Sequence, residues 1–462
     1  LVVQFLGEAV LMTFLSLTVA LALVSMLLPA FNQLTGKQIS LDPTPEWIGT
    51  LLVLCVATGV ISGSYPAFYL SGLQPVSMFQ GRVKNAFSEL LARKGLVVFQ
   101  FAISLFLIVA VVVVHRQLHF IQSKNLGYDK SNVLYLEKEG AAQQNPEAFL
   151  AALRKIPGVL NASAIQQSVV QNASGASPYG VDWPGKTEKD LINFNIRAVD
   201  YDLIETLDIP FREGRSFSRA FGAEERNIIF NETAIRAMGL NDPVGKSVRL
   251  WGEEKTIIGV VRDFHLASLH EPIAPMVFTY RPQNTALIMA KIQAGQEQAT
   301  IGRLKQFYQR YNPGCVFDFR FLDEDYQALY VSENRVSTLS RYFAGLAILI
   351  SCLGLFGLAT FTAGQRSKEI GIRKVLGASV AGITRMLAAD FLRLVVLAIV
   401  IASPLAWWAM RHWLGEFAYH IDLQPWMFAG AAAAAIGIAL LTVGVQSARA
   451  ALVNPVEVLR KE

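Results

Sequence analysis

Long apolar runs alternate with polar stretches along the chain, and this alternation predicts its architecture. Six runs are about as long as the roughly 20 residues that a helix needs to cross the hydrocarbon core of a bilayer. Backbone polar groups in lipid must be satisfied within the segment, so each run is predicted to be a helix. The predicted spans lie at about residues 6–30, 47–70, 96–115, 340–363, 387–410 and 426–446.

Basic residues in the connecting segments predict the orientation of these spans. The segments after the second, fourth and sixth runs carry more Lys and Arg than Asp and Glu, and they share one side of the membrane if the runs alternate. Short loops rich in Lys and Arg stay in the cytoplasm. The short connections at 31–46 and 411–425 and the large segment at 116–338 are therefore predicted to lie outside the cytoplasm.

The large external segment contains patterns typical of both strands and helices. Its mixture predicts an α+β domain, and the fold class is a polytopic α-helical membrane protein with an inserted extracytoplasmic α+β domain. The chain then divides into three parts, at 1–115, 116–338 and 339–462, with three spans in the first and three in the last. The predicted strands are 132–136, 255–261 and 286–292, and the predicted helices are 146–155 and 296–311.

A polar island at 365–385 lies between the fourth and fifth spans, and its apolar residues recur at helical spacing. We expect a short amphipathic helix along the membrane face at about 366–379. A cytoplasmic helix with exposed apolar side chains needs a partner to cover them. This helix is therefore the candidate for receiving force from another protein. Its charged residues are Arg366, Lys368, Arg373, Lys374 and Arg385, against Glu369 alone.

Composition supports the membrane assignment and excludes other classes. The chain has 462 residues, of which 53% are hydrophobic and 17% charged, and its mean hydropathy is +0.37. The formal charge of +5 is explained by the cytoplasmic loops, so no nucleic-acid partner is expected. Cys55 and Cys352 lie in apolar runs and Cys315 lies alone in the polar segment, so no intrachain disulfide framework is expected.

Two short stretches resemble a phosphate-binding loop and a metal site, but the details of each favour a structural turn. The stretch 239–247 resembles a phosphate-binding loop, but it has five residues between its glycines and a proline among them, which favours a turn before a strand. His265 and His270 accompany Asp263, but their spacing fits no standard zinc site, which favours a structural turn. We assign no catalytic, cofactor-binding or metal-binding residue. The spans carry no midplane carboxylate or His, which disfavours a secondary transporter.

The stretch 366–378 most specifically resembles the cytoplasmic segment of FtsX/MacB-type permeases of ABC transporters. The end of the chain, 454–460, is similar to the family's closing motif, and 198–202, 208–217 and 259–265 are similar to its periplasmic core domain. The resemblance implies that the segment couples to an ATPase. The coupling residues that it implies are Glu369, Ile370, Gly371, Ile372, Arg373, Lys374, Leu376, Gly377 and Ala378.

This resemblance implies a mechanism and a set of partners. A separate cytoplasmic ABC ATPase, acting as a dimer, would bind ATP and Mg, so the chain itself would be no enzyme and would carry no cofactor. Glu369, Arg373 and Lys374 would make polar contacts to the ATPase, while Ile370, Ile372 and Leu376 would fill a groove in it. The spans would transmit this movement to the external domain. By this mechanism, called mechanotransmission, the protein would export or extract an envelope substrate such as a drug, a peptide or a lipoprotein.

Further expectations concern location and extent. The protein is expected in the bacterial inner membrane, in contact with lipid and with an envelope client or adaptor protein. The resemblance is to a two-module subtype, and the chain is expected to be a piece that lacks the first two spans and the first external domain. An alternative function is a non-transporting signalling or scaffold protein that regulates an envelope partner.

Overall fold

Six long helices form the membrane part of the protein. The structure is a computed structural model, and it describes residues 2–71, 86–170, 180–265 and 268–452. Within these residues, six helices are long and apolar enough to cross a membrane, which confirms the six predicted spans. Several extend well beyond the apolar runs. They are α1 (Val2–Thr35), α2 (Pro45–Ser71), α4 (Ala86–Ser123), α11 (Val331–Gln365), α13 (Val380–Leu414) and α14 (Pro425–Leu452).

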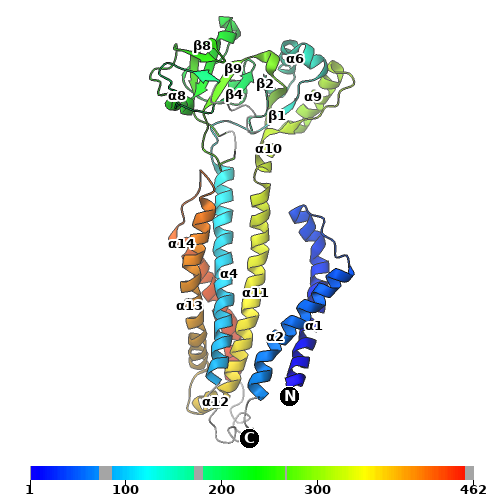
Figure 1. The fold of residues 1–462 in the computed structure, drawn as a ribbon, viewed down its shortest axis with the longest axis vertical. Helices are drawn as coiled ribbons and strands as arrows, with labels where there is room; N and C mark the ends of the chain where they lie inside the picture. Colours follow the sequence, from blue (N-terminus) through cyan, green and yellow to red (C-terminus); the bar gives the residue numbers. More distant parts are fainter. Residues whose placement is uncertain (1, 72–85, 171–179, 266–267, 453–462) are drawn as a thin grey trace. The chain divides into compact units, whose positions relative to one another are not determined.

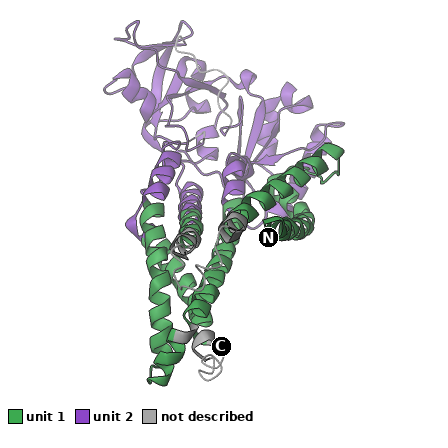
Figure 2. Cartoon of the chain, turned by 60° about the horizontal axis from the view of Figure 1, so that its bottom comes forward, with its two compact units in different colours: residues 1–108, 338–403, 429–462 green, residues 109–337, 404–428 purple. Residues whose placement is uncertain are grey.

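The chain divides into two compact units, coloured separately in Figure 2. The first contains residues 1–108, 338–403 and 429–462, and the second contains 109–337 and 404–428. The second unit thus holds the external domain together with the C-terminal part of α13, the first residues of α14 and the connection between these two helices. Sequence patterns alone placed that connection with the last part of the chain.

Within the first unit, α1 and α2 pack closely through two glycines of α2. A Cβ atom at Gly59 would lie 2.8 Å from the Val10 Cα atom, and one at Gly63 would lie 2.7 Å from the Ala9 Cβ atom. Small residues spaced four apart allow helix backbones to approach in a membrane. The two helices have 34 and 27 residues, close to the 35 and 28 of α13 and α14.

Polar side chains also connect α4, α11 and α14 inside the first unit. The buried Ser104 and Ser351 hydroxyls share a hydrogen bond of 2.9 Å between α4 and α11. Gln446 Nε2 on α14 donates to Thr360 Oγ1 on α11 at 2.9 Å. Such bonds between helices satisfy polar groups that lipid cannot, so they fix which faces of the helices meet.

The second unit is built on one mixed sheet, in the order β11-β1-β10-β2-β4-β9-β6-β8-β7-β3, with β5 paired to β8. The β4–β9 and β6–β8 pairs are parallel and the others are antiparallel. Its strands are β1 (Val133–Glu137), β2 (Val159–Ile165), β3 (Val181–Asp182), β4 (Asn195–Val199), β5 (Phe211–Gly214), β6 (Asn227–Asn231), β7 (Ser247–Leu250), β8 (Glu253–Val261), β9 (Met276–Tyr280), β10 (Leu287–Ile292) and β11 (Arg320–Phe321).

Short helices cover this sheet in two groups, which Figure 1 shows near its two ends. The predicted α+β class is confirmed, as are the three predicted strands, seen as β1, β8 and β10, and the two predicted helices, seen as α6 and α9. The helices of this unit are α5 (Gly140–Gln144), α6 (Pro146–Leu153), α7 (Leu203–Thr206), α8 (Glu232–Met238), α9 (Glu297–Tyr311) and α10 (Leu322–Ala328).

Alternating burial along the strands divides the core of this unit into three clusters. Leu134 and Ile288 face α6 and α9 in one cluster, whereas Phe230 packs with α8 in a second. Their neighbours along the same strands, such as Tyr135 of β1 and Met289 of β10, belong to a third cluster. Successive residues of a strand point to opposite faces, so the third cluster covers the other side of the sheet. The domain therefore has two lobes, one with α6 and α9 and one with α8.

Candidate functional site

The candidate coupling segment contains a short helix, α12 (Ser367–Val375), between α11 and α13. The helix ends at Gly377, whose φ of +93° lies in the left-handed region that favours glycine. Gly377 N donates to Lys374 O at 3.1 Å and Ala378 N donates to Arg373 O at 2.9 Å, the hydrogen-bond pattern of a glycine-terminated helix. The predicted helix continued to about 379, so Gly377 stops it earlier than the apolar spacing indicated.

Ser379 begins the next helix immediately after this stop. Its Oγ accepts a hydrogen bond from Gly382 N at 3.2 Å, so it caps the N-terminus of α13. The glycine stop and the serine cap lie two residues apart and make a tight turn between α12 and α13. The direction of α12 is therefore set by α13.

Ile370 fastens α12 to α13 through an apolar contact. It is buried, with 5% exposed, in a cluster with Ile383 and Leu387 of α13. We expected Ile370 to fill a groove in a partner, but its side chain is covered by the chain's own α13. Gly371 beside it is also buried. Ile370 thus positions the segment, and the partner-facing role falls to other residues.

Two ion pairs involve the same segment, one to α13 and one within α12. Arg366 Nη1 lies 2.9 Å from Asp390 Oδ2 on α13, and Arg373 Nη2 lies 2.8 Å from Glu369 Oε1 within α12. All four side chains are a third to nearly half exposed, so each pair contributes only about 0–1 kcal/mol. The Arg366–Asp390 pair helps to orient α12 against α13, the Glu369–Arg373 pair stabilises α12 itself, and Glu369 and Arg373 remain accessible from solvent.

Three large apolar side chains of the segment are left exposed. Ile372, Val375 and Leu376 are 52%, 66% and 80% exposed, and their spacing of three and four residues places them on one face. Ile372 and Leu376 were predicted as contact residues, whereas Val375 was missed from the candidate set although it follows the same spacing. Lys374 is half-buried and Ala378 is exposed. The face is an apolar patch with charges around it.

A second polar and aromatic site lies in the other unit, around the connection between α13 and α14. We call residues 415–424 the junction segment. Ala418 N donates to His270 O at 3.3 Å and Tyr419 N donates to Leu269 O at 3.2 Å. The buried Gln117 of α4 donates from Nε2 to Tyr419 O at 3.0 Å and accepts from Ile421 N at 2.9 Å. The junction segment is therefore fixed to both α4 and the loop after β8.

The two histidines that suggested a metal site take part in this packing. His270 Nε2 lies 3.2 Å from Glu333 Oε1, and its ring stacks on Phe417 with centroids 3.9 Å apart. His265 is buried and meets Tyr419 edge-on at 4.5 Å. Burial lowers the pKa of His265 to about 4, with the nearby Lys124 acting in the same direction. Both rings serve to join the loop after β8 to the junction segment.

Asp263, the third member of that stretch, has a structural partner of its own. Its Oδ1 accepts from Thr233 N at 2.8 Å, and its Oδ2 accepts from Thr233 Oγ1 at 2.9 Å and from Arg236. The carboxylate thus holds the first turn of α8. In the part of the chain that the structure describes, no group of three His, Cys, Asp or Glu side chains is placed to hold a metal.

The stretch that resembled a phosphate-binding loop is a turn between α8 and β7. Gly239 and Gly245 have φ angles of +65° and +89°, and Lys246 donates from Nζ to Asn241 O across the turn. A phosphate-binding loop leads into a helix whose N-terminus faces the anion, but here a strand follows. The expected turn before a strand is confirmed.

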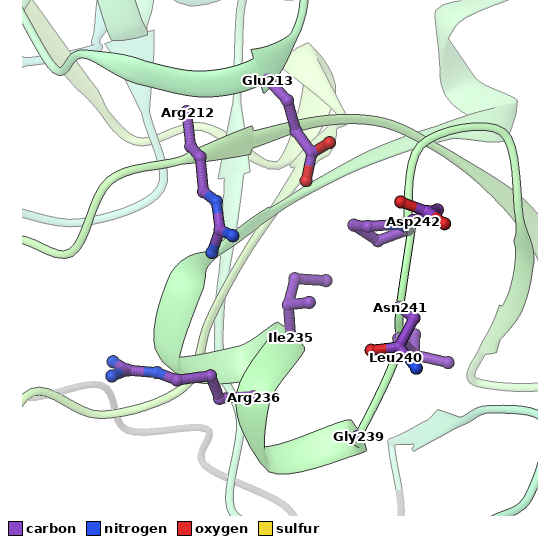
Figure 3. Close-up of a pocket in the computed structure, with 9 residues that line it drawn as sticks. Arg212, Glu213, Ile235, Arg236, Gly239, Leu240, Asn241 and Asp242 are labelled. Carbon is purple, nitrogen blue, oxygen red and sulfur yellow. The ribbon is translucent and has the colours of Figure 1, made fainter.

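This turn also borders a cleft of about 520 Å³ on the external domain. Figure 3 shows Arg212 and Glu213 of β5 on one side, and Asn241 and Asp242 of the turn on the other. Ile235 of α8 lies between them. The charges around this cleft have both signs, and Arg212 is already 3.6 Å from Glu232. The cleft gives no preference for one class of ligand.

Comparison with known families identifies both parts of the chain. Residues 341–455 match the FtsX-like permease C-terminal family, and residues 96–307 match the MacB-like periplasmic core domain. The chain belongs to the FtsX/MacB-type family of ABC transporter permeases. The permease is a multi-pass membrane protein with an extracytoplasmic domain. The first match includes the coupling segment, whereas the closing motif at 454–460 lies outside the described residues.

Individual relatives are distant. The permease is 19% identical over 258 residues to the uncharacterized ABC transporter permease YknZ of Bacillus subtilis, covering 53% of this chain and 63% of that protein. It is 22% identical over 201 residues to a probable export ATP-binding/permease protein of Pseudomonas fluorescens, covering 40% of this chain and 30% of that protein. The permease thus spans less than two thirds of either relative.

Two solved structures also resemble part of the permease. One is the periplasmic region of MacB from Actinobacillus actinomycetemcomitans, with a TM-score of 0.32 at 14% identity over 45% of this chain and 97% of that chain. The other is the extracellular domain of the noncanonic ABC-type transporter YknZ from Gram-positive bacteria, with a TM-score of 0.29 at 14% identity over 41% of this chain and 97% of that chain.

Proposed function

We propose that the permease couples ATP hydrolysis by a separate cytoplasmic ATPase to movement of its extracytoplasmic domain. The exposed apolar face of α12, formed by Ile372, Val375 and Leu376, carries this proposal. Apolar side chains on a helix that faces water indicate a surface for a protein partner. ATP and Mg would bind to the ATPase, which would act as a dimer, and the movement would export or extract an envelope substrate.

The attachment of α12 supports the transfer of force from such a partner. Ile370 and the Arg366–Asp390 pair tie α12 to α13, so a displacement of α12 would carry the base of α13 with it. On the other side, α12 follows α11, which is one continuous helix of 35 residues and about 50 Å. A long helix without a break transmits displacement along its axis, because its hydrogen bonds resist compression.

The charges around the apolar face would set the orientation of the partner. Glu369, Arg373 and Lys374 lie on the same short helix, and complementary charges at the rim of an interface act mainly on association rate and register. The apolar side chains would supply most of the affinity, since the centre of an interface is the part that loses water. Lipid and an envelope client or adaptor would contact other parts of the protein.

A pair of matched valine substitutions tests this proposal. Val375→Asp places a charge in the proposed interface, and Val316→Asp makes the same change at a valine of the external domain that is 78% exposed. Each variant would be co-purified from membranes with the ABC ATPase proposed as its partner. We expect Val375→Asp to lose the ATPase, since an unpaired buried charge costs several kcal/mol.

The control variant and the wild type should retain the ATPase equally. The proposal fails if Val375→Asp inserts normally and holds as much ATPase as Val316→Asp. Transport is tested separately, by measuring substrate export with an ATPase whose hydrolysis has been disabled. Export that continues at the normal rate would contradict coupling even if the two proteins bind.

A further inference from the structure

The outer end of α4 carries a cation that lies on an aromatic ring. Arg116 directly follows the apolar run at 96–115, and its side chain is exposed. Its Cζ atom lies 4.9 Å from the centroid of the Trp426 ring, which belongs to the first turn of α14 and is 45% exposed. The external domain continues from this end of α4. Arg116 and Trp426 therefore lie where two spans leave the membrane on its extracytoplasmic side.

Both partners of this pair are held in place by the protein itself. Trp426 Nε1 donates to Gln424 Oε1, so the polar end of the indole is already satisfied. Gln117, the neighbour of Arg116, is bonded to the junction segment, which leads directly into α14. Among the described residues, no carboxylate pairs with Arg116. Because the ring covers only the face of the guanidinium, the N–H donors at its edge remain open to a ligand.

The surroundings of this pair favour an anionic ligand at the depth of the lipid headgroups. Residues 111–124 of α4 contain no Asp or Glu. His119, which is also exposed, lies one turn beyond Arg116, about 4.5 Å further along the helix axis. Tryptophan is enriched at the membrane–water interface, where its ring lies at headgroup level, so Trp426 marks that depth beside Arg116. The molecules that meet Arg116 at this depth are therefore phospholipids.

We propose that Arg116 and Trp426 form a binding site for the headgroup of an anionic phospholipid in the outer leaflet. A guanidinium donates two parallel N–H bonds to phosphate oxygens, and His119 would contact the part of the headgroup beyond the phosphate. A zwitterionic headgroup fits less well, because its ammonium group needs a carboxylate or an open ring face. Arg116 already covers the Trp426 ring, and residues 111–124 offer no carboxylate.

A lipid bound at this site would contact α4 and the start of α14 together. It would therefore support the packing of these two helix ends beside the junction segment. This inference does not depend on the ATPase partner.

The test is native mass spectrometry of the full chain in detergent, which counts the lipids that stay bound to each molecule. The probes are dioleoyl phosphatidylglycerol and dioleoyl phosphatidylcholine, with glycerol 3-phosphate as a phosphate that has no acyl chains. The attraction of one arginine for an anionic headgroup corresponds to about fivefold in affinity, so we expect the wild type to prefer phosphatidylglycerol to phosphatidylcholine by about that factor. Equal affinity for the two lipids, or displacement of phosphatidylglycerol by glycerol 3-phosphate, would overturn the proposal.

Two variants and two controls connect this binding to Arg116 and Trp426. Arg116→Gln should lower the affinity for phosphatidylglycerol to that for phosphatidylcholine. Arg335→Gln should not, because Arg335 is exposed near the outer end of α11 but lies on no described aromatic ring. Trp426→Leu should weaken binding about threefold through the lost contact between cation and ring, whereas Trp408→Leu, at an α13 tryptophan that is 67% exposed, should leave it unchanged. Equal affinity for phosphatidylglycerol in the two arginine variants would overturn the proposal, and so would equal affinity in the two tryptophan variants.

Discussion

Gln117→Leu is the substitution that most sharply tests the attachment of the junction segment. Gln117 is fully buried, and its side chain makes two hydrogen bonds to the segment, to Tyr419 O at 3.0 Å and from Ile421 N at 2.9 Å. Leucine has a similar size and can make neither bond. The backbone hydrogen bonds from Ala418 and Tyr419 to the loop after β8 would remain, so the segment should loosen without detaching.

The size of this loosening follows from the two lost bonds. A hydrogen bond within a protein contributes about 0.5–1.5 kcal/mol net, so the two together stabilise the closed segment by about 1–3 kcal/mol. Every 1.4 kcal/mol is a factor of ten, so the population of the opened segment should rise by about 5- to 150-fold. Local opening of this kind appears directly in amide hydrogen exchange.

The assay is hydrogen exchange followed by mass spectrometry on the full chain. We expect peptides that contain residues 418–423 to exchange faster in Gln117→Leu, with the Ile421 amide most affected because it loses its acceptor. Gln446→Leu is the control, since Gln446 also makes a hydrogen bond between membrane helices, but to Thr360 in the other unit. Unchanged exchange at 418–423 in a correctly folded Gln117→Leu protein would refute the reasoning.

Three further substitutions have defined outcomes. Gly59→Leu should separate α1 from α2 and lower the thermal stability of the protein in detergent, whereas Gly49→Leu on the same helix should not, because nothing lies within 4 Å of a Cβ atom at Gly49. Asn231→Ala removes three hydrogen bonds of a buried side chain and should cost about 2–4 kcal/mol in denaturant unfolding, against about 0.5–1 kcal/mol for the exposed helix cap Asn145→Ala. The pKa of His265 is lowered from 6.5 to about 4, so unfolding midpoints should fall as the pH drops from about 6.5 toward 4, and His265→Phe should reduce this dependence. An equal loss in both glycine variants, an equal cost in both asparagine variants, or an unchanged pH profile would contradict the respective expectation.

Much of the membrane part was predictable because lipid leaves the sequence few options. An apolar run of sufficient length must form a helix, and the six spans were visible for that reason. The ends of the helices were not predictable, since α11 and α13 continue through polar residues beyond the apolar runs. The end of α12 is set by the left-handed backbone conformation of Gly377, which the spacing of apolar residues does not indicate.

The coupling segment shows where sequence reasoning reached its limit. The resemblance implied that Ile370 and Ile372 both fill a groove in the partner, but which of them is buried depends on Ile383 and Leu387 of the next helix. The set of coupling residues stays a prediction, with Val375 added to it by its exposure.

Long-range pairing explains the features that the sequence did not indicate. The junction segment appeared to be a plain connection, because its partners are at positions 117, 269 and 270, far away along the chain. Neither residue spacing nor local composition carries such information.

The most direct test of the account is site-specific photo-crosslinking from α12 to the ATPase. A photoreactive amino acid would replace Leu376, which is 80% exposed, or Val316 in the external domain as the control. Illumination of membranes that contain both proteins should yield a permease–ATPase adduct from position 376 and none from position 316. An assembled, normally inserted permease that gives no adduct from position 376 would contradict the claim that α12 receives the force of ATP hydrolysis.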